Sequence, residues 1–222
     1  MFLSVVIPTI NEEKSIGPAI KKIKKYVKGH RSEIIVVDTN STDRTVTIAR
    51  SLGAKIINEP RRGYGHAYKT GFSHAVGDII ITLDADSTYP AESIPDLLKL
   101  LETKNADFVS GLRIPCDGSM TSKHRFGNWV ITQWANLLFG TNFKDSQSGM
   151  WVFRKKLLKK MSLVDNRWPF SGEIKIEAAK HGNFLEVPIK YTNREGISKV
   201  SSISVGMENI KFLFRKRFFL KG

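Results

Sequence analysis

The sequence predicts an α/β fold in which a mostly parallel, doubly wound sheet is flanked by helices, and three observations support this prediction. Strand-length apolar runs alternate with helical patterns through the first half of the chain. Residues 79–83 form a β-branched apolar run of the kind that a sheet buries on both faces. That run ends at Asp84 and Asp86, and ligands of open α/β sheets bind outside the carboxyl ends of strands. Two carboxylates there suit Mg2+ or Mn2+ carrying a substrate's phosphates, although a solvated turn would also end a strand in this way.

Strand and helix patterns follow one another in strict order over the first 83 residues. The first helix is expected to carry acids in its first turn, at Glu12 and Glu13, and one apolar face. The second is expected to follow a polar cap at residues 40–43. The expected elements are a strand over 3–8, a helix from 11 to 29, a strand over 33–38, a helix ending at 53, a strand over 54–58, a glycine-rich basic loop over 61–67, a helix ending near 77 and a strand over 78–83.

The second half of the chain is less regular. Helices are expected over 94–101, 126–139 and 172–180, and strands over 107–111, 148–153 and 183–191. Residues 113–122 and 192–202 are polar and carry basic side chains, so we expect loops that are mobile until an anionic ligand binds. We predict one domain over residues 1–202 and a basic amphipathic helix over 203–222. One stripe of this helix would be Ile203, Met207, Ile210, Phe214 and Phe218, with Phe212 and Phe219 on its far side.

The composition limits the class of protein. Cys116 is the single cysteine, so no disulfide can form within the chain, which fits a reducing compartment. The formal net charge of +14 favours a polyanionic partner: a nucleic acid, an anionic membrane surface or a phosphorylated substrate. A strand begins at the N-terminus and no apolar run reaches about 18 residues, so we expect neither a signal peptide nor a membrane-spanning helix.

Two further features suggest a nucleotide site. Asp38 follows the second strand, where an acid can accept hydrogen bonds from a ribose or a base; it could equally cap the turn before the next helix. Gly63 and Gly65 would let the backbone approach a phosphate, with Arg62 and Lys69 adding positive charge. This loop is not a Walker A motif, so on its own it is a weak signal.

In combination, the motifs resemble those of the inverting family-2 glycosyltransferases, which have the GT-A fold. The N-terminal motifs are Val5-Val6-Ile7-Pro8 with Asn11-Glu12, Val37-Asp38 with Ser41-Thr42-Asp43, and Leu83-Asp84-Ala85-Asp86 with Tyr89-Pro90. Three later segments are similar to those of the polyprenyl-phosphate sugar synthases, the dolichyl-phosphate mannose or glucose type. These are residues 145–150, residues 169–177, and Val187-Pro188-Ile189 with Arg194, Gly196, Ser198 and Lys199.

The resemblance implies a donor half over residues 1–112 and an acceptor half over 113–202. The residues expected to bind a UDP- or GDP-hexose are Pro8, Asn11, Glu12, Asp38, Ser41, Asp43, Lys69, Asp84, Ala85 and Asp86. Asp86 and Asp84 would hold the metal; Arg113, Arg125 and Lys199 would meet the acceptor phosphate; and Asp84, Asp86, Arg113 and Arg194 would be catalytic. Thr88 departs from the Gln that mannose synthases often have. The Gln-x-x-Arg-Trp motif of processive synthases is absent, which argues against chain elongation.

The expected function is therefore inverting, metal-dependent transfer of a single mannose or glucose to a polyprenyl phosphate. A phosphate monoester is already ionised near neutral pH and needs positioning by Arg and Lys more than a strong base. An alternative acceptor, the hydroxyl of a sugar, protein or lipid, would need a carboxylate base, for which Asp145 and Glu173 are candidates. Glu173 and Glu177, interleaved with Lys175 and Lys180, could equally form an ordinary salt-bridged helix surface.

A lipid acceptor leads us to expect a peripheral protein on the cytoplasmic face of a membrane. The basic C-terminal helix would lie on anionic lipid, with Phe126, Val130, Trp134 and Leu137 as a second apolar stripe and Trp129 beside it. The alternative is a helix buried against the sheet. A basic nucleic-acid-binding module is a further alternative from another class. We disfavour it because no such motif is recognisable and the acids stand at strand ends.

Overall fold

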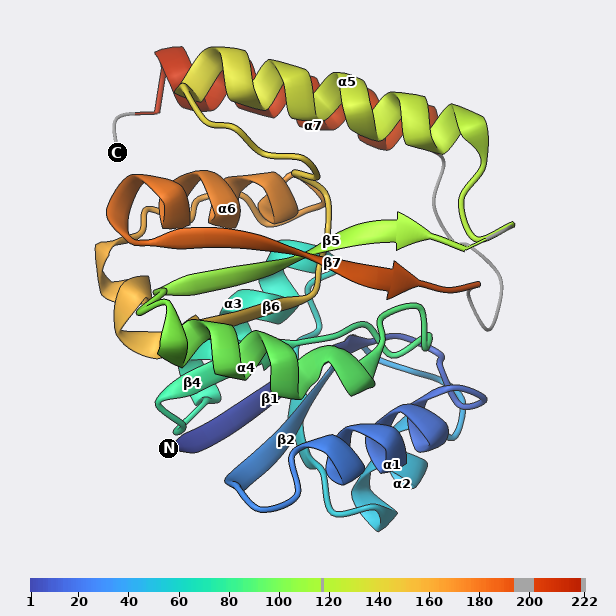
Figure 1. Cartoon of the computed structure of the whole chain (residues 1–222). Coiled ribbons are helices and arrows are strands. Elements are labelled where there is room, and N and C mark those ends of the chain that lie inside the picture. Colours follow the sequence, from blue (N-terminus) through green and yellow to red (C-terminus); the bar gives the residue numbers. More distant parts are fainter. Residues whose placement is uncertain (117, 194–201, 221–222) are drawn as a thin grey trace.

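The structure is a computed structural model that describes residues 1–116, 118–193 and 202–220, and it confirms the α/β prediction (Figure 1). One seven-stranded sheet has the order β3-β2-β1-β4-β6-β5-β7. β6 is antiparallel to β4 and β5, and the other neighbours are parallel. The strands are β1 Phe2–Thr9, β2 Arg31–Asp38, β3 Lys55–Asn58, β4 Ile79–Thr82, β5 Phe108–Pro115, β6 Trp151–Arg154 and β7 Phe184–Tyr191.

Helices cover both faces of this sheet. α1, α2 and α4 bury their apolar side chains against one face, and α3 and α6 bury theirs against the other. α5 and α7 pack together outside α6 (Figure 1). The α-helices are α1 Ile16–Tyr26, α2 Thr45–Ser51, α3 Tyr64–His74, α4 Ile94–Thr103, α5 Ser122–Phe139, α6 Phe170–His181 and α7 Ser202–Phe218, and the short 3-10 helices are η1 Ala91–Ser93 and η2 Lys155–Lys160.

The central strands form because their apolar runs can be buried on both sides. Val5, Val6 and Ile80 have no exposed surface. The parallel register pairs Thr9 of β1 with Asp38 of β2, and Val6 of β1 with Thr82 of β4. The polar residues that follow these strands therefore meet at one edge of the sheet.

Two predicted boundaries are wrong. α1 begins at Ile16, so Glu12 and Glu13 precede the helix; their backbone amides donate to Thr45 and Asp43 instead of lying in a first helical turn. β5 continues to Pro115 because it pairs with β7 along its whole length, so residues 113–115 are strand and not loop. Most of the other expected loop, residues 194–201, lies outside the described residues.

α6 is buried from Phe170 to Ala178, so the alternative of an ordinary salt-bridged surface for this helix is wrong. Glu173, Lys175 and Glu177 are all buried. The reason is tertiary: Ile174 faces the sheet while Ile176 faces the layer made by α5 and α7, so the helix has little contact with solvent. Local charge alternation could not reveal this second layer.

α7 is held against α6 by buried charges. Lys216 Nζ lies 2.9 Å from Glu173 Oε1 and 3.0 Å from Glu177 Oε1, and it also donates to the carbonyl of Ser162. Phe212 and Leu213 are buried beside it, whereas Met207 and Phe218 are exposed. The buried face of α7 is therefore rotated from the predicted stripe. It includes Phe212, because Lys216 on the same face is paired with the two acids of α6.

We predict that Lys216→Ala lowers the free energy of unfolding by about 3 kcal/mol, because it leaves two buried carboxylates without their cation. Urea denaturation at pH 7 measures this change. Lys211→Ala, an exposed lysine on the same helix, should change stability by less than about 0.5 kcal/mol. Equal effects of the two substitutions would contradict the buried role of Lys216.

Candidate active site at the carboxyl ends of the central strands

The loops that follow β1 and β2 are tied together. Asn11 has a left-handed backbone, with φ of 51°, and its amide donates to Ser41 Oγ at 2.8 Å. In return, Asn11 Oδ1 accepts the backbone amide of Thr42, also at 2.8 Å. Glu12 completes this junction through its amide and Thr45 Oγ1, 2.7 Å apart. The result is a rigid edge at the place where the sequence predicts nucleoside binding.

The two acids after β2 hold these loops in shape. Asp38 accepts the amide and hydroxyl of Ser41, at 2.9 and 2.5 Å, so the turn-capping role considered for it is present. Asp43 accepts the amide and hydroxyl of Thr45 and the amide of Glu13. Burial raises the pKa of Asp43, but these hydrogen bonds outweigh burial and lower it. Contacts of either acid with a nucleoside stay a prediction.

Asp84 follows β4 and receives two tyrosine hydroxyls. Tyr64 and Tyr68 lie one turn apart on α3, and their hydroxyl oxygens are 3.3 and 3.4 Å from Asp84 Oδ1. Burial, and next the negative charge of Asp84, raises the pKa of both phenols well above 10, so both stay protonated and can donate to the carboxylate. The sequence reasoning missed these residues, although their spacing of four places them on one face of the helix that begins in the glycine loop.

Asp86 is buried, and its Oδ1 accepts the amide and the hydroxyl of Thr88 at 3.1 and 2.7 Å. Ala85 packs into the core between the two acids. Within the described ranges, no cluster of three or more His, Cys, Asp or Glu side chains suits a metal. Asp84 and Asp86 alone still fit Mg2+ or Mn2+, because such ions are commonly held by one or two carboxylates together with substrate phosphates.

Arg113 and Asp145 form a buried bidentate ion pair. Arg113 Nε and Nη2 lie 2.7 and 2.8 Å from the two carboxylate oxygens, and the side chains are 10% and 9% exposed. Burial would raise the pKa of Asp145, but the adjacent guanidinium holds it well below its ordinary value. Lys175 donates to the backbone carbonyl of Asp145, and burial lowers the pKa of that lysine to about 8.

Two tyrosines neighbour both this ion pair and Asp84. Tyr89 and Tyr191 contact each other, with ring centroids 5.4 Å apart, and Arg113 lies over the Tyr191 ring. Burial is the main cause that raises the pKa of both hydroxyls; Arg113 opposes it and Asp84 reinforces it. The two hydroxyls therefore lie within electrostatic range of both Arg113 and Asp84.

The other predicted site residues are more dispersed. Pro8 is in β1 beside Val37. Lys69 on α3 has Glu173 and Asp165 as its acidic neighbours. Arg125 is exposed near the start of α5, while Arg194 and Lys199 lie outside the described residues. Glu173, a candidate base, is fully buried and accepts the amides of Val164 and Asp165 as well as Lys216.

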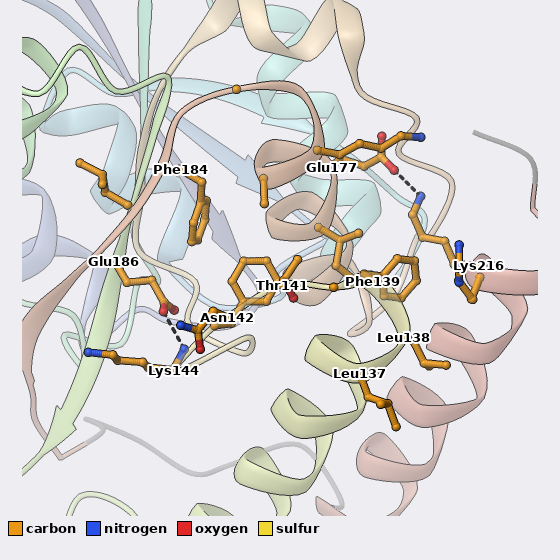
Figure 2. A pocket seen from close by; sticks show the side chains of 18 of the residues that line it. Leu137, Leu138, Phe139, Thr141, Asn142, Lys144, Glu177, Phe184, Glu186 and Lys216 are labelled. Atoms are coloured by element: carbon orange, nitrogen blue, oxygen red, sulfur yellow. Dashed lines mark hydrogen bonds and ion pairs between the residues drawn. The ribbon is translucent and has the colours of Figure 1, made fainter.

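A cavity of about 1220 Å3 lies elsewhere, between β7, α6 and the last turns of α5 and α7 (Figure 2). Its labelled acids are already engaged: Glu177 with Lys216, and Glu186 with the backbone amide of Lys144. None of the strand-end acids lines it. We therefore place the candidate active site at the strand ends, where the acids lie, and not in this cavity.

Comparison with known proteins gives a family match. Residues 4–162 match the family described as Glycosyl transferase family 2. The chain is 36% identical over 206 residues to a dolichyl-phosphate hexose transferase of Haloferax volcanii, covering 92% of this chain and 89% of that protein. It is also 36% identical to the low-salt glycan biosynthesis hexosyltransferase Agl6 of the same organism, covering 95% of this chain but only about half, 52%, of Agl6.

A third relative, the dolichol-phosphate mannosyltransferase of Pyrococcus furiosus, is 29% identical, with 97% of this chain and 63% of that protein covered. Among solved structures, the glucosyl-3-phosphoglycerate synthase of Mycobacterium tuberculosis in complex with Mg2+ and UDP is similar, with a TM-score of 0.78 at 20% identity. The match covers 100% of this chain and 80% of that one. This similarity confirms the expected GT-A fold.

We predict that Asp145→Asn lowers the stability at pH 7 by about 3–5 kcal/mol, because Arg113 is then buried without its anion. The folded-state pKa of Asp145 is depressed, so its contribution is complete above the unfolded-state pKa of about 3.9 and is lost as the pH falls. The variant should therefore lose less stability than the wild type between about pH 5 and pH 2. Urea titrations across this range measure the difference, with exposed Asp96→Asn as the control. Parallel pH profiles for wild type and Asp145→Asn would contradict it.

Proposed function

The chain belongs to glycosyl transferase family 2, and on that premise we propose that it transfers one hexose from a nucleotide-sugar donor to a polyprenyl phosphate. Two relatives named for dolichyl- or dolichol-phosphate transfer support this substrate class. The observation that carries it is the charge arrangement: Asp84 and Asp86 follow β4, and Tyr89 and Tyr191 lie within electrostatic range of both Asp84 and Arg113.

The donor half of the proposal concerns Asp84 and Asp86. They would hold Mg2+ or Mn2+, which supplies positive charge to a nucleoside diphosphate as it leaves. The linked loops after β1 and β2 would hold the nucleoside, because they present a fixed edge with backbone and side-chain polar groups. Tyr64 and Tyr68 keep Asp84 oriented by donating to its carboxylate.

The acceptor half concerns Arg113 and its neighbours. A phosphate monoester is ionised near neutral pH, so the protein needs to position it and offset its charge. Asp145 fixes the guanidinium of Arg113 through two hydrogen bonds, and we propose that Arg125, Arg194 and Lys199 add charge as the acceptor binds. The roles of these four basic residues remain predictions.

Transfer to a hydroxyl group is the alternative, and it requires a carboxylate base. Both candidates are engaged in other contacts: Asp145 is paired with Arg113, and Glu173 is bound by two amides and Lys216. A carboxylate with a strongly depressed pKa is a weak base, which further disfavours Asp145. A phosphate acceptor avoids this requirement.

We predict hexose transfer from a UDP- or GDP-hexose to a short polyprenyl phosphate in the presence of Mn2+ or Mg2+, with one hexose added per acceptor as read by mass spectrometry. Asp86→Asn should lower the rate at least roughly 100-fold, because the diphosphate loses its charge partner. Exposed Asp96→Asn on α4 is the matched control and should keep the rate. Transfer to hydroxyl acceptors alone, or to no acceptor from any donor, would refute the proposal.

α5 and α7 form an exposed apolar surface, and a lipid acceptor would explain it. We propose that this surface contacts an anionic membrane, with the protein peripheral on its cytoplasmic face. On α5, Phe126 and Leu137 are 66% and 74% exposed, and Phe219, directly after α7, is 80% exposed. The two helices meet where Trp134 contacts Phe214.

Three exposed basic residues, Lys211, Arg215 and Arg217, lie on α7. An interfacial helix combines such groups. Within the described residues, no helix has the length and apolar character that crossing a membrane requires.

We predict that the protein floats with anionic liposomes at moderate salt, and that Phe126→Ser with Trp129→Ser, or Phe218→Ser with Phe219→Ser, reduces the floating fraction several-fold. Point substitutions are preferable to truncation of α7, which would also remove the buried Lys216. Val76→Ser, at an exposed apolar position outside α5 and α7, is the control. If wild type stays at the bottom of the gradient, the membrane surface is wrong while the transfer reaction stands on its own assay.

A further inference from the structure

Residues 165–168 are fixed against the start of α3. The amides of Gly65 and His66 donate to the carbonyls of Arg167 and Asn166 at 3.2 and 3.1 Å. The approach is so close that a Cβ on Gly65 would lie 2.6 Å from the carbonyl oxygen of Asp165. In the structure, the glycine loop that the sequence suggested for phosphate contact docks this segment.

This docking connects Trp168 to Asp84 through Tyr64. Its ring stacks on Tyr64, with centroids 5.1 Å apart and planes 23° apart, and the Tyr64 hydroxyl is 3.3 Å from Asp84 Oδ1. The Tyr64 hydroxyl also lies over Gly149, where a Cβ would be 2.2 Å away. Tyr64 is thus held between Asp84 and the chain before β6, and its ring packs against one face of the Trp168 indole.

Trp168 differs from its aromatic neighbours in exposure. Tyr68, Trp151 and Phe170 in the same cluster are fully buried, whereas Trp168 is 38% exposed. A large aromatic ring that is rigidly backed and partly open is suited to contact a ligand. A hexopyranose offers C–H groups on its ring faces and hydroxyls at its edges, so a flat aromatic surface fits it.

We propose that Trp168 is a specificity-determining residue that stacks against the hexose of the donor, with Tyr64 as its support. This inference rests on the proposed function and deepens it, because it assigns recognition of the sugar to a group apart from those that bind the nucleoside diphosphate. Trp168 should therefore add affinity for a nucleotide sugar over the corresponding nucleoside diphosphate.

The test compares Kd values with Mn2+ for UDP and UDP-glucose, and for GDP and GDP-mannose, by calorimetry. For the pair that the wild type binds, Trp168→Ala should weaken nucleotide-sugar binding about tenfold and leave nucleoside diphosphate binding within about twofold. Trp168→Phe should retain most of the sugar's contribution. Tyr64→Phe, which keeps the supporting ring and removes only the hydroxyl, should retain it too. Melting temperatures check that each variant is folded.

An equal loss for both ligands in Trp168→Ala, or no loss for either, would overturn this inference and leave the proposed function intact. Failure of the wild type to bind any of the four nucleotides would instead refute the proposed function and, with it, the role given to Trp168. If Trp168→Ala fails to fold, Trp168→Phe decides the outcome, because it preserves a ring on Tyr64. A Trp168→Phe variant that has lost the whole preference for the nucleotide sugar over the nucleoside diphosphate would count against stacking on the sugar.

Discussion

The buried carboxylate of Glu173 is the interaction on which the second half of the structure depends. Its oxygens accept the amides of Val164 and Asp165 and the ammonium group of Lys216. One side chain thus fixes α7 to α6 and also fixes the start of the segment that docks on α3. A buried acid is unfavourable unless it is paired and hydrogen-bonded, so this geometry is well defined. The segment that Glu173 holds contacts Tyr64 through Trp168, and Tyr64 in turn donates to Asp84.

The parallel half of the fold could be predicted from the sequence because its signals are local. The runs that form β1, β2 and β4 are apolar on both faces, and the acids after them can only gather at one edge of a parallel sheet. Asp84 and Asp86 were found in this way. The family motifs then supplied the other expected site residues, and the structure describes all of these except Arg194 and Lys199.

The remainder depends on contacts between distant segments. The start of α1 is set by Thr45 and Asp43, about thirty positions further along the chain, which take the amides of Glu12 and Glu13. Lys175 and Glu177 are buried because α5 and α7 form a second helical layer over α6. The sequence pattern of α6 does not predict this layer. Trp168 was not singled out because its connection to Asp84 runs through Tyr64, 104 residues earlier in the chain (168 − 64). Such placements are properties of packing rather than of a motif.

The end of the sheet at β7 has a consequence for the solubility of the folded chain. Among the strands that the structure describes, β7 pairs only with β5, so its outer backbone could recruit a strand from a second molecule. Pro188 stands in the middle of β7 and is exposed, and proline has no amide hydrogen to offer to an incoming strand. Exposed Lys190 lies two residues further along and adds charge. The strand is thereby protected against edge-to-edge aggregation, a hazard that a chain with long apolar strands would otherwise carry.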